Sequence, residues 1–194
     1  SLRLLGVDLG HAPGETWLTG GPERQIETAV AGMFQLMDGD VKATGLKKLQ
    51  GLIWRDGFHR GEMVAHLYDD VTPAMRSWRK SGIDLRIYSS GSVAAQKLFF
   101  GHSVAGDLLP LLSDHYDTTT GGKKESASYR RIAEDAGFAP AEMLFVSDIP
   151  EELRAAADAG MQVVLSVRPG NGEVTDREQW PWVDSFSQLS ISPA

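Results

Sequence analysis

Two hydrophobic patterns divide the chain near residue 66. Before this point, apolar side chains recur every three or four positions over residues 23–37 and 46–54, the spacing of one face of an α-helix. Glycines at positions 57 and 61 are expected to end the second helix. After residue 66, short apolar runs alternate with helical stretches. The pattern predicts a small α-helical module over residues 1–66 and an α/β core over residues 67–194.

The core is expected to alternate helices with strands. A helix begins at Val71 and ends before Gly82. The further elements predicted are helices at 93–100, 126–136 and 151–159 and strands at 83–88, 143–147 and 162–167. Strands separated by helices of this length form a parallel sheet with right-handed crossovers. The fold class is therefore α/β.

The two ends of the chain lack this regularity. Residues 1–22 contain five glycines and two prolines around short apolar pieces, which predicts a loop with one short strand at residues 2–7. The tail, residues 168–194, is also expected to be mostly loop. Its larger apolar side chains are expected to pack it against the core; they are Trp180, Trp182, Phe186 and Leu189.

Composition narrows the function classes. The formal net charge is −7 and the pI is near 5.2, the opposite sign to that of a sequence-independent nucleic-acid binder. There is no cysteine, which excludes disulfide scaffolds, zinc ribbons and thiol catalysis. No apolar run approaches the length of a membrane span. We expect a cytoplasmic monomer that binds neither nucleic acid nor a membrane.

Serine and glycine residues follow the predicted strand at 83–88. Ser89, Ser90 and Gly91 lie between this strand and the helix at 93–100. Hydroxyl groups and unpaired N–H groups at a helix N-terminus favour an anion such as phosphate. An ordinary serine helix cap explains the same residues, and the sequence leaves both interpretations open.

Charged residues occupy two other loops of the predicted sheet. Lys123 follows two glycines and precedes a helix, where it can neutralise a phosphate oxygen or remain a solvated surface lysine. Asp148 follows the strand at 143–147, and Glu152 lies one helical turn further on. Carboxylates at a strand tip can hold Mg²⁺ beside a phosphate, although Asp148 could instead cap the next helix.

The order of these residues resembles that of the haloacid dehalogenase phosphatases. Members of that superfamily have, in this order along the chain, a Ser or Thr after one strand, a lysine before a helix and an Asp after another strand. Longer stretches resemble the acireductone synthase (enolase-phosphatase) family of methionine salvage. These stretches are residues 44–54, 87–103, 128–133 and 167–171.

The resemblance implies a Rossmann-type parallel sheet with an α-helical cap, and it implies an activity. Family members enolise 2,3-diketo-5-methylthiopentyl-1-phosphate and then dephosphorylate the product to the acireductone, with Mg²⁺ as cofactor. Carried over by position, Ser89, Ser90 and Gly91 would bind the phosphate of this small substrate. Lys123 would hold the phosphate and the nucleophile, and Asp148 would bind Mg²⁺. Glu152 would belong to the Mg²⁺ site without binding the ion directly, and Gln96 and His102 would have supporting roles.

One part of the family pattern is missing. The nucleophilic aspartate after the first strand, in Asp-x-Glu-Gly-Thr, has no counterpart in this sequence. The nearest candidate is Asp8, after the predicted strand at 2–7, but it lies closer to Leu46 than the family's nucleophile does to its cap helix. We expect that residues 1–22 belong to a partial cap and that the usual first strand is lacking. The remaining strands would then have open edges.

Other interpretations stay open at this point. Asp8 could stand on a shortened first strand as the nucleophile. The chain could be a non-catalytic relative that binds phosphate or Mg²⁺, or a phosphatase of another small phosphorylated metabolite. It could also be a purely structural α/β domain.

Overall fold

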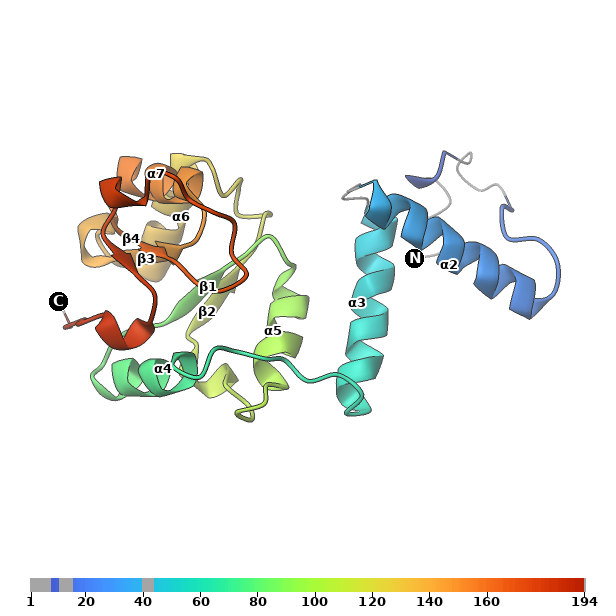
Figure 1. Cartoon of the computed structure of the whole chain (residues 1–194), viewed down its shortest axis with the longest axis horizontal. Helices are drawn as coiled ribbons and strands as arrows, with labels where there is room; N and C mark the ends of the chain where they lie inside the picture. Colours follow the sequence, from blue (N-terminus) through green and yellow to red (C-terminus); the bar gives the residue numbers. More distant parts are fainter. Residues whose placement is uncertain (1–7, 11–15, 40–43, 194) are drawn as a thin grey trace. The chain divides into compact units, whose positions relative to one another are not determined.

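The computed structural model describes residues 8–10, 16–39 and 44–193, which form two compact units, Ser1–Met63 and Val64–Ala194 (Figure 1). The strand predicted at residues 2–7 lies outside the described residues. In the ranges that are described, no helix is both long enough and apolar enough to cross a membrane.

The first unit contains two long helices, α2 (Pro22–Asp38) and α3 (Thr44–His59). Both were predicted, and α3 ends at His59, between the two glycines that were expected to end it. Gly57 lies inside the helix, where its missing side chain makes room for Met63: an added Cβ would lie 2.8 Å from the Met63 sulfur. Gly61 follows the helix with a φ of +69°, which suits glycine.

The buried face of α2 is narrow. Ala29, Gly32 and Leu36 are buried, and Leu36 packs with Leu46 of α3. The larger apolar side chains of α2, which carry most of its helical pattern, are exposed; they are Ile26, Val30, Phe34 and Met37. The periodicity thus predicted the helix correctly but not the face that is buried.

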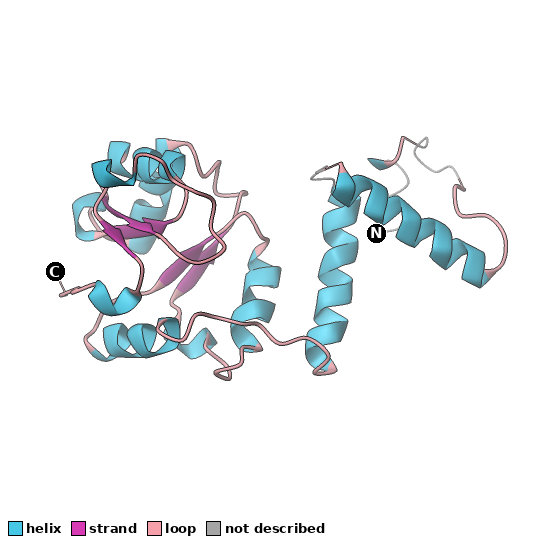
Figure 2. Cartoon of the chain, viewed as in Figure 1, coloured by secondary structure: helices cyan, strands magenta, loops and turns pink. Residues whose placement is uncertain are grey.

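The second unit has the predicted alternation of helices and strands (Figure 2). Its elements are α4 (Val71–Lys80), β1 (Arg86–Tyr88), α5 (Val93–Gly101), β2 (Asp114–Tyr116), α6 (Ser126–Ala136), β3 (Leu144–Ser147), α7 (Pro150–Asp158), β4 (Gln162–Ser166) and β5 (Trp182–Val183). The strand β1 is shorter than the predicted 83–88. Two strands were missed: β2, which is short and polar, and β5, which has only two residues.

All strand pairs are parallel, as the sequence predicted, but they form two separate sheets. β1 pairs with β2, and β3 pairs with β4, which pairs with β5. Among the described residues, β1 and β3 therefore each have a neighbour on one side only. Strands of a parallel sheet are normally buried on both faces, yet β1 has no fully buried residue and β3 has only Ser147. The open edges expected from the sequence stay a prediction, because residues 2–7 lie outside the described residues.

The packing around α6 connects the two sheets. Tyr129 of α6 is 1% exposed and contacts Tyr88 of β1 and Phe145 of β3 with its ring. The centroid distances are 5.5 and 4.9 Å, and both contacts are edge-to-face, a favoured aromatic geometry. The surrounding core comes from α6 and α7 and from the segment leading into β4; its buried members are Ala133, Ala155, Ala156, Ala159 and Met161.

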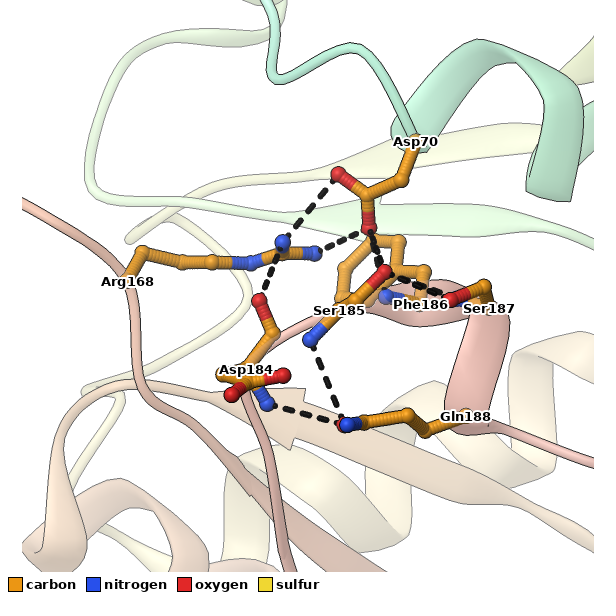
Figure 3. Close-up of polar contacts among 7 residues, drawn as sticks. All are labelled: Asp70, Arg168, Asp184, Ser185, Phe186, Ser187 and Gln188. Atoms are coloured by element: carbon orange, nitrogen blue, oxygen red, sulfur yellow. Dashed lines mark hydrogen bonds and ion pairs between the residues drawn. The ribbon is translucent and has the colours of Figure 1, made fainter.

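The loop after β4 is tied to the start of α4 and to the tail by Arg168 (Figure 3). The Arg168 side chain is 7% exposed and donates to both carboxylate oxygens of Asp70, at 3.1 and 2.7 Å, and to the Asp184 carbonyl at 2.6 Å. Its guanidinium lies over the rings of Tyr68 and Phe186, at 5.0 and 4.8 Å. This Arg168 clamp uses the planar, five-donor geometry that lysine lacks.

Removal of the clamp should destabilise the second unit. We expect Arg168→Ala to lower the free energy of unfolding by about 2–3 kcal/mol, because Asp70 would keep a partly buried charge without its partner. Urea unfolding followed by circular dichroism measures the change. Arg76→Ala is the matched control, since Arg76 is exposed on α4, and it should change stability by less than about 0.5 kcal/mol.

The difference in free energy of unfolding between wild type and Arg168→Ala should depend on pH. Burial alone would raise the pKa of Asp70, but hydrogen bonds from Arg168, the Phe186 N–H and Ser185 lower this pKa below its ordinary value of 3.8. A lowered folded-state pKa stabilises the fold above the unfolded value, and this contribution is lost as the pH falls through the folded value. The difference between wild type and Arg168→Ala should thus be full at pH 7 and shrink below about pH 4. Equal differences at both pH values would contradict this account of the clamp.

Candidate functional site

The predicted site residues of the second unit follow the ends of β1 and β3. Ser89, Ser90 and Gly91 come directly after β1, and Asp148 comes directly after β3. Lys123 precedes α6, and its Nζ lies 2.6 Å from Glu152 Oε2 on α7. The same Nζ lies 5.7 Å from the centroid of Tyr88, the last residue of β1. The structure therefore brings Lys123 and Glu152 together next to the end of β1.

The Ser89–Gly91 loop has a defined hydrogen-bond pattern. The Ser89 hydroxyl accepts the Gly91 N–H at 3.2 Å, and the Ser89 N–H donates to the Tyr116 carbonyl at 3.1 Å. The helix cap of α5 is Ser92, whose hydroxyl accepts the Ala95 N–H. The serine-cap interpretation therefore applies to Ser92 and not to Ser89 or Ser90. Since Ser89 Oγ accepts the Gly91 N–H, the hydroxyl proton can point to a ligand.

Two tyrosine hydroxyls donate hydrogen bonds to the backbone of the loop that carries Lys123. Tyr88 donates to the Gly121 carbonyl at 2.9 Å, and Tyr129 donates to the Lys123 carbonyl at 2.6 Å. Glycine is required at 121, where φ is +148° and an added Cβ would lie 2.2 Å from Ser128 Oγ. Gly121 thus allows the backbone to lie close to Ser128.

The Lys123 side chain is partly buried and fixed by an ion pair, so it is not a solvated surface residue. Its side chain is 20% exposed, whereas that of the neighbouring Lys124 is 66% exposed. Glu152, 8% exposed, also accepts a hydrogen bond from Ser147 Oγ at 2.8 Å on the oxygen that contacts Lys123. Glu152 therefore anchors Lys123 from α7. The ammonium has three donors, so it can still bind an anion while it keeps this contact.

The two tyrosines next to Lys123 stay protonated donors. Burial is the main cause that raises the pKa of Tyr88, and the nearby Glu152 and Glu125 carboxylates raise it further. Burial, with Glu152 as the next cause, likewise raises the pKa of Tyr129. Their hydroxyls therefore keep holding the Lys123 loop across the physiological pH range. Sequence reasoning did not select these tyrosines; the only available signal was the position of Tyr88 directly before Ser89.

Asp148 borders a cavity of about 390 Å³ whose other walls come from residues 166–178. The N-cap of α7 is Ile149 and it has no side-chain cap, so Asp148 does not serve as the helix cap that the sequence allowed. In the described part of the chain, no three His, Asp or Glu side chains cluster as a metal site. Asp148 still fits Mg²⁺, which commonly binds one or two carboxylates and keeps waters and phosphate oxygens as its other ligands.

Asp8 belongs to the first unit. Its Oδ2 accepts the Gly45 N–H at 2.6 Å, at the N-terminus of α3, where a carboxylate is favoured by the unpaired N–H groups. The contact explains a structural role for this residue. Its role as the nucleophile stays a prediction.

Comparisons with known proteins agree on one family. A family model described as haloacid dehalogenase-like hydrolase matches residues 14–160. The chain is 55% identical over 156 residues to enolase-phosphatase E1 of Drosophila mojavensis, covering 79% of this chain and 63% of the relative. It is 48% identical over 168 residues to enolase-phosphatase E1 of Klebsiella oxytoca, covering 87% and 72%.

A solved structure is similar in fold as well as in sequence. The UTR4 protein of Saccharomyces cerevisiae matches with a TM-score of 0.74 and 32% identity, over 96% of this chain and 87% of that protein. The chain spans somewhat less than two thirds of the length of the first curated relatives it matches, from Drosophila mojavensis and Synechococcus elongatus.

The ion pair between Lys123 and Glu152 can be tested by measuring the free energy of unfolding of variants. We expect Lys123→Met to lower the free energy of unfolding by about 2–3 kcal/mol, because it leaves the Glu152 carboxylate buried without a cation. Adding Glu152→Gln should recover part of the loss, and urea unfolding of the single and double variants measures both effects. Lys124→Met is the matched control, since its contact with Glu151 is exposed, and it should cost less than about 0.5 kcal/mol. Equal costs for the two lysine variants would contradict the anchor.

Proposed function

Because the chain belongs to the haloacid dehalogenase-like hydrolases and, among them, to the enolase-phosphatase E1 proteins, we propose that it is a Mg²⁺-dependent enolase-phosphatase of methionine salvage. Its substrate would be 2,3-diketo-5-methylthiopentyl-1-phosphate and its product the acireductone. The observation that carries the proposal is the Lys123 site: a buried carboxylate holds a cation next to the end of β1, which the Ser89–Gly91 loop follows.

In this proposal the phosphate binds at the strand ends. The hydroxyls of Ser89 and Ser90 donate to its oxygens, and the Lys123 ammonium neutralises part of its charge. Glu152 keeps the ammonium in place, so little conformational entropy is lost when the phosphate arrives. Positive charge fixed where negative charge develops is the usual source of catalysis in phosphoryl transfer.

Asp148 is the residue that would hold Mg²⁺. When bound, the ion would draw charge from the phosphate oxygens and help to orient the group for in-line attack. The half-buried Asp148 borders a cavity with room for waters, as a partly hydrated ion requires.

The proposed reaction also requires a nucleophile. Attack by a carboxylate on phosphorus splits the transfer into two easier steps, and Asp8 is the residue that the sequence suggests for it. The contact between Asp8 and the Gly45 N–H favours the second candidate function, a relative that binds phosphate and Mg²⁺ without turnover. A different small phosphorylated metabolite is the remaining alternative substrate. We further propose that the chain acts as a monomer in the cytoplasm; its lack of cysteine is in keeping with a reducing compartment.

Phosphate binding should depend on Mg²⁺ through Asp148. We expect inorganic phosphate to bind the chain more tightly when Mg²⁺ is present, and we expect Asp148→Asn to remove this enhancement because an amide is a weak ligand for a hard cation. Isothermal titration calorimetry with and without Mg²⁺ measures the difference. Glu151→Gln, in the exposed first turn of α7, is the matched control and should keep the enhancement. Equal enhancement in both variants would exclude Asp148 as the metal ligand.

Turnover separates the two candidate functions. The non-catalytic candidate predicts little or no release of inorganic phosphate from a phosphomonoester with Mg²⁺, in keeping with the fact that no carboxylate other than Glu152 contacts Lys123 among the described residues. The enolase-phosphatase predicts robust release. A phosphate-release assay on wild type and Asp8→Asn makes the comparison. Robust release that Asp8→Asn abolishes would contradict the non-catalytic candidate and identify Asp8 as the nucleophile.

A further inference from the structure

Gln96 of α5 is a buried amide whose hydrogen-bonding groups contact three parts of the second unit. The side chain is 5% exposed. Its Nε2 donates to the carbonyls of Gly91 and Tyr116, both at 2.8 Å, and its Oε1 lies 3.2 Å from His115 Nδ1. A primary amide has two N–H donors and one carbonyl, and all three have partners here.

The two carbonyls that Gln96 contacts lie at opposite ends of the Ser89–Gly91 loop. Gly91 closes the loop, and its carbonyl is bound directly. Tyr116 ends β2, and its carbonyl also accepts the Ser89 N–H, with which the loop begins. One side-chain nitrogen therefore sets the distance between the two ends of the loop.

The two carbonyls do not by themselves require an amide at this position. The Tyr116 carbonyl already has a backbone partner in the Ser89 N–H, and Gly91 is only half-buried. Burying an amide is unfavourable unless every group is satisfied. An apolar side chain of the same size would fill the same space but would leave the His115 ring without its partner. What the amide adds is a defined loop geometry.

His115 orients the amide. It is 8% exposed, and its ring packs 6.2 Å from that of Phe100. Burial and, after it, Lys97 lower the pKa of His115, which keeps the ring neutral at pH 7. With its proton on Nδ1, the ring donates to Gln96 Oε1 and so directs Nε2 to the two carbonyls. The reversed amide would place an oxygen against two carbonyl oxygens.

We propose that Gln96 is a positioning residue that holds the Ser89–Gly91 loop in the geometry that binds phosphate, with His115 fixing the orientation of its amide. Gln96 does not touch the phosphate. It acts through the backbone at Ser89 and Gly91, which holds the Ser89 hydroxyl where its proton can point to the ligand. This inference rests on the proposed function, because it gives the loop its purpose.

The experiment compares Gln96→Met, which keeps the volume and loses all three hydrogen bonds, with wild type in the full chain. We expect the affinity for inorganic phosphate with Mg²⁺, measured by calorimetry, to fall roughly tenfold or more, the equivalent of one to two net hydrogen bonds. Amide hydrogen exchange at Ser89 and Gly91 should accelerate, while exchange at the β3–β4 pairs stays unchanged. The matched control is Gln162→Met, which removes an exposed amide that donates to the Ala141 carbonyl at 3.0 Å.

Gln96→Glu adds a second measurement, the pH dependence of phosphate affinity, which should not change if Gln96 only contributes to folding. At pH 8 its carboxylate faces two carbonyl oxygens and cannot donate, so phosphate affinity relative to wild type should fall as in Gln96→Met. At pH 5 a protonated carboxyl can donate one hydrogen bond, and the relative affinity should partly recover. Urea unfolding at both pH values separates loss of affinity from loss of fold.

The outcomes distinguish this inference from the proposed function. If wild type binds phosphate and Gln96→Met binds it within twofold of wild type, the positioning role is wrong, whatever the variant's stability. Unchanged exchange at Ser89 and Gly91 would overturn it equally. If wild type binds no phosphate, the proposed function fails and the inference fails with it.

Discussion

The packing of Tyr129 against Tyr88 and Phe145 is the interaction on which the rest of the second unit depends. Through these contacts α6 holds together two sheets that share no backbone hydrogen bonds among the described residues. The same tyrosine donates to the Lys123 carbonyl, so the ring that connects the sheets also fixes the loop of the candidate site. Tyr129 thus connects the core with the candidate site, because its ring packs in the core and its hydroxyl donates to the backbone of the Lys123 loop.

The site lies where the sheets are least complete. Ser89 and Asp148 follow β1 and β3, the two strands that have a neighbour on one side only in the described part of the chain. Ligands of open α/β sheets bind at the carboxyl ends of the strands, and that rule is the reason for proposing Ser89 and Asp148 as binding residues. The chain is 55% and 48% identical to two relatives named enolase-phosphatase E1, but the proposed activity needs a nucleophile in addition to groups that bind phosphate and metal.

Sequence reasoning predicted the main elements of the second unit, the parallel sheet and the family because alternation of apolar runs and the spacing of motifs are local properties. It identified Lys123 and Glu152 as site residues but did not predict that they pair, since they lie on different elements. It missed β2, which is short and polar, and β5, which has two residues, because strands this short form only when a neighbouring strand is present. It expected α3 to end at Gly57 and Gly61, and the helix ends between them, at His59.

The sequence by itself determined the α/β class, the order of the chemical residues and the membership of a phosphatase family. Only the tertiary structure decided that Ser92, rather than Ser89, caps α5, that Glu152 holds Lys123, and that Gln96 ties both ends of the phosphate loop. The physical reason is that a motif specifies residue types in order along the chain. A hydrogen bond or ion pair depends on which distant elements the core brings within 3 Å or so of each other.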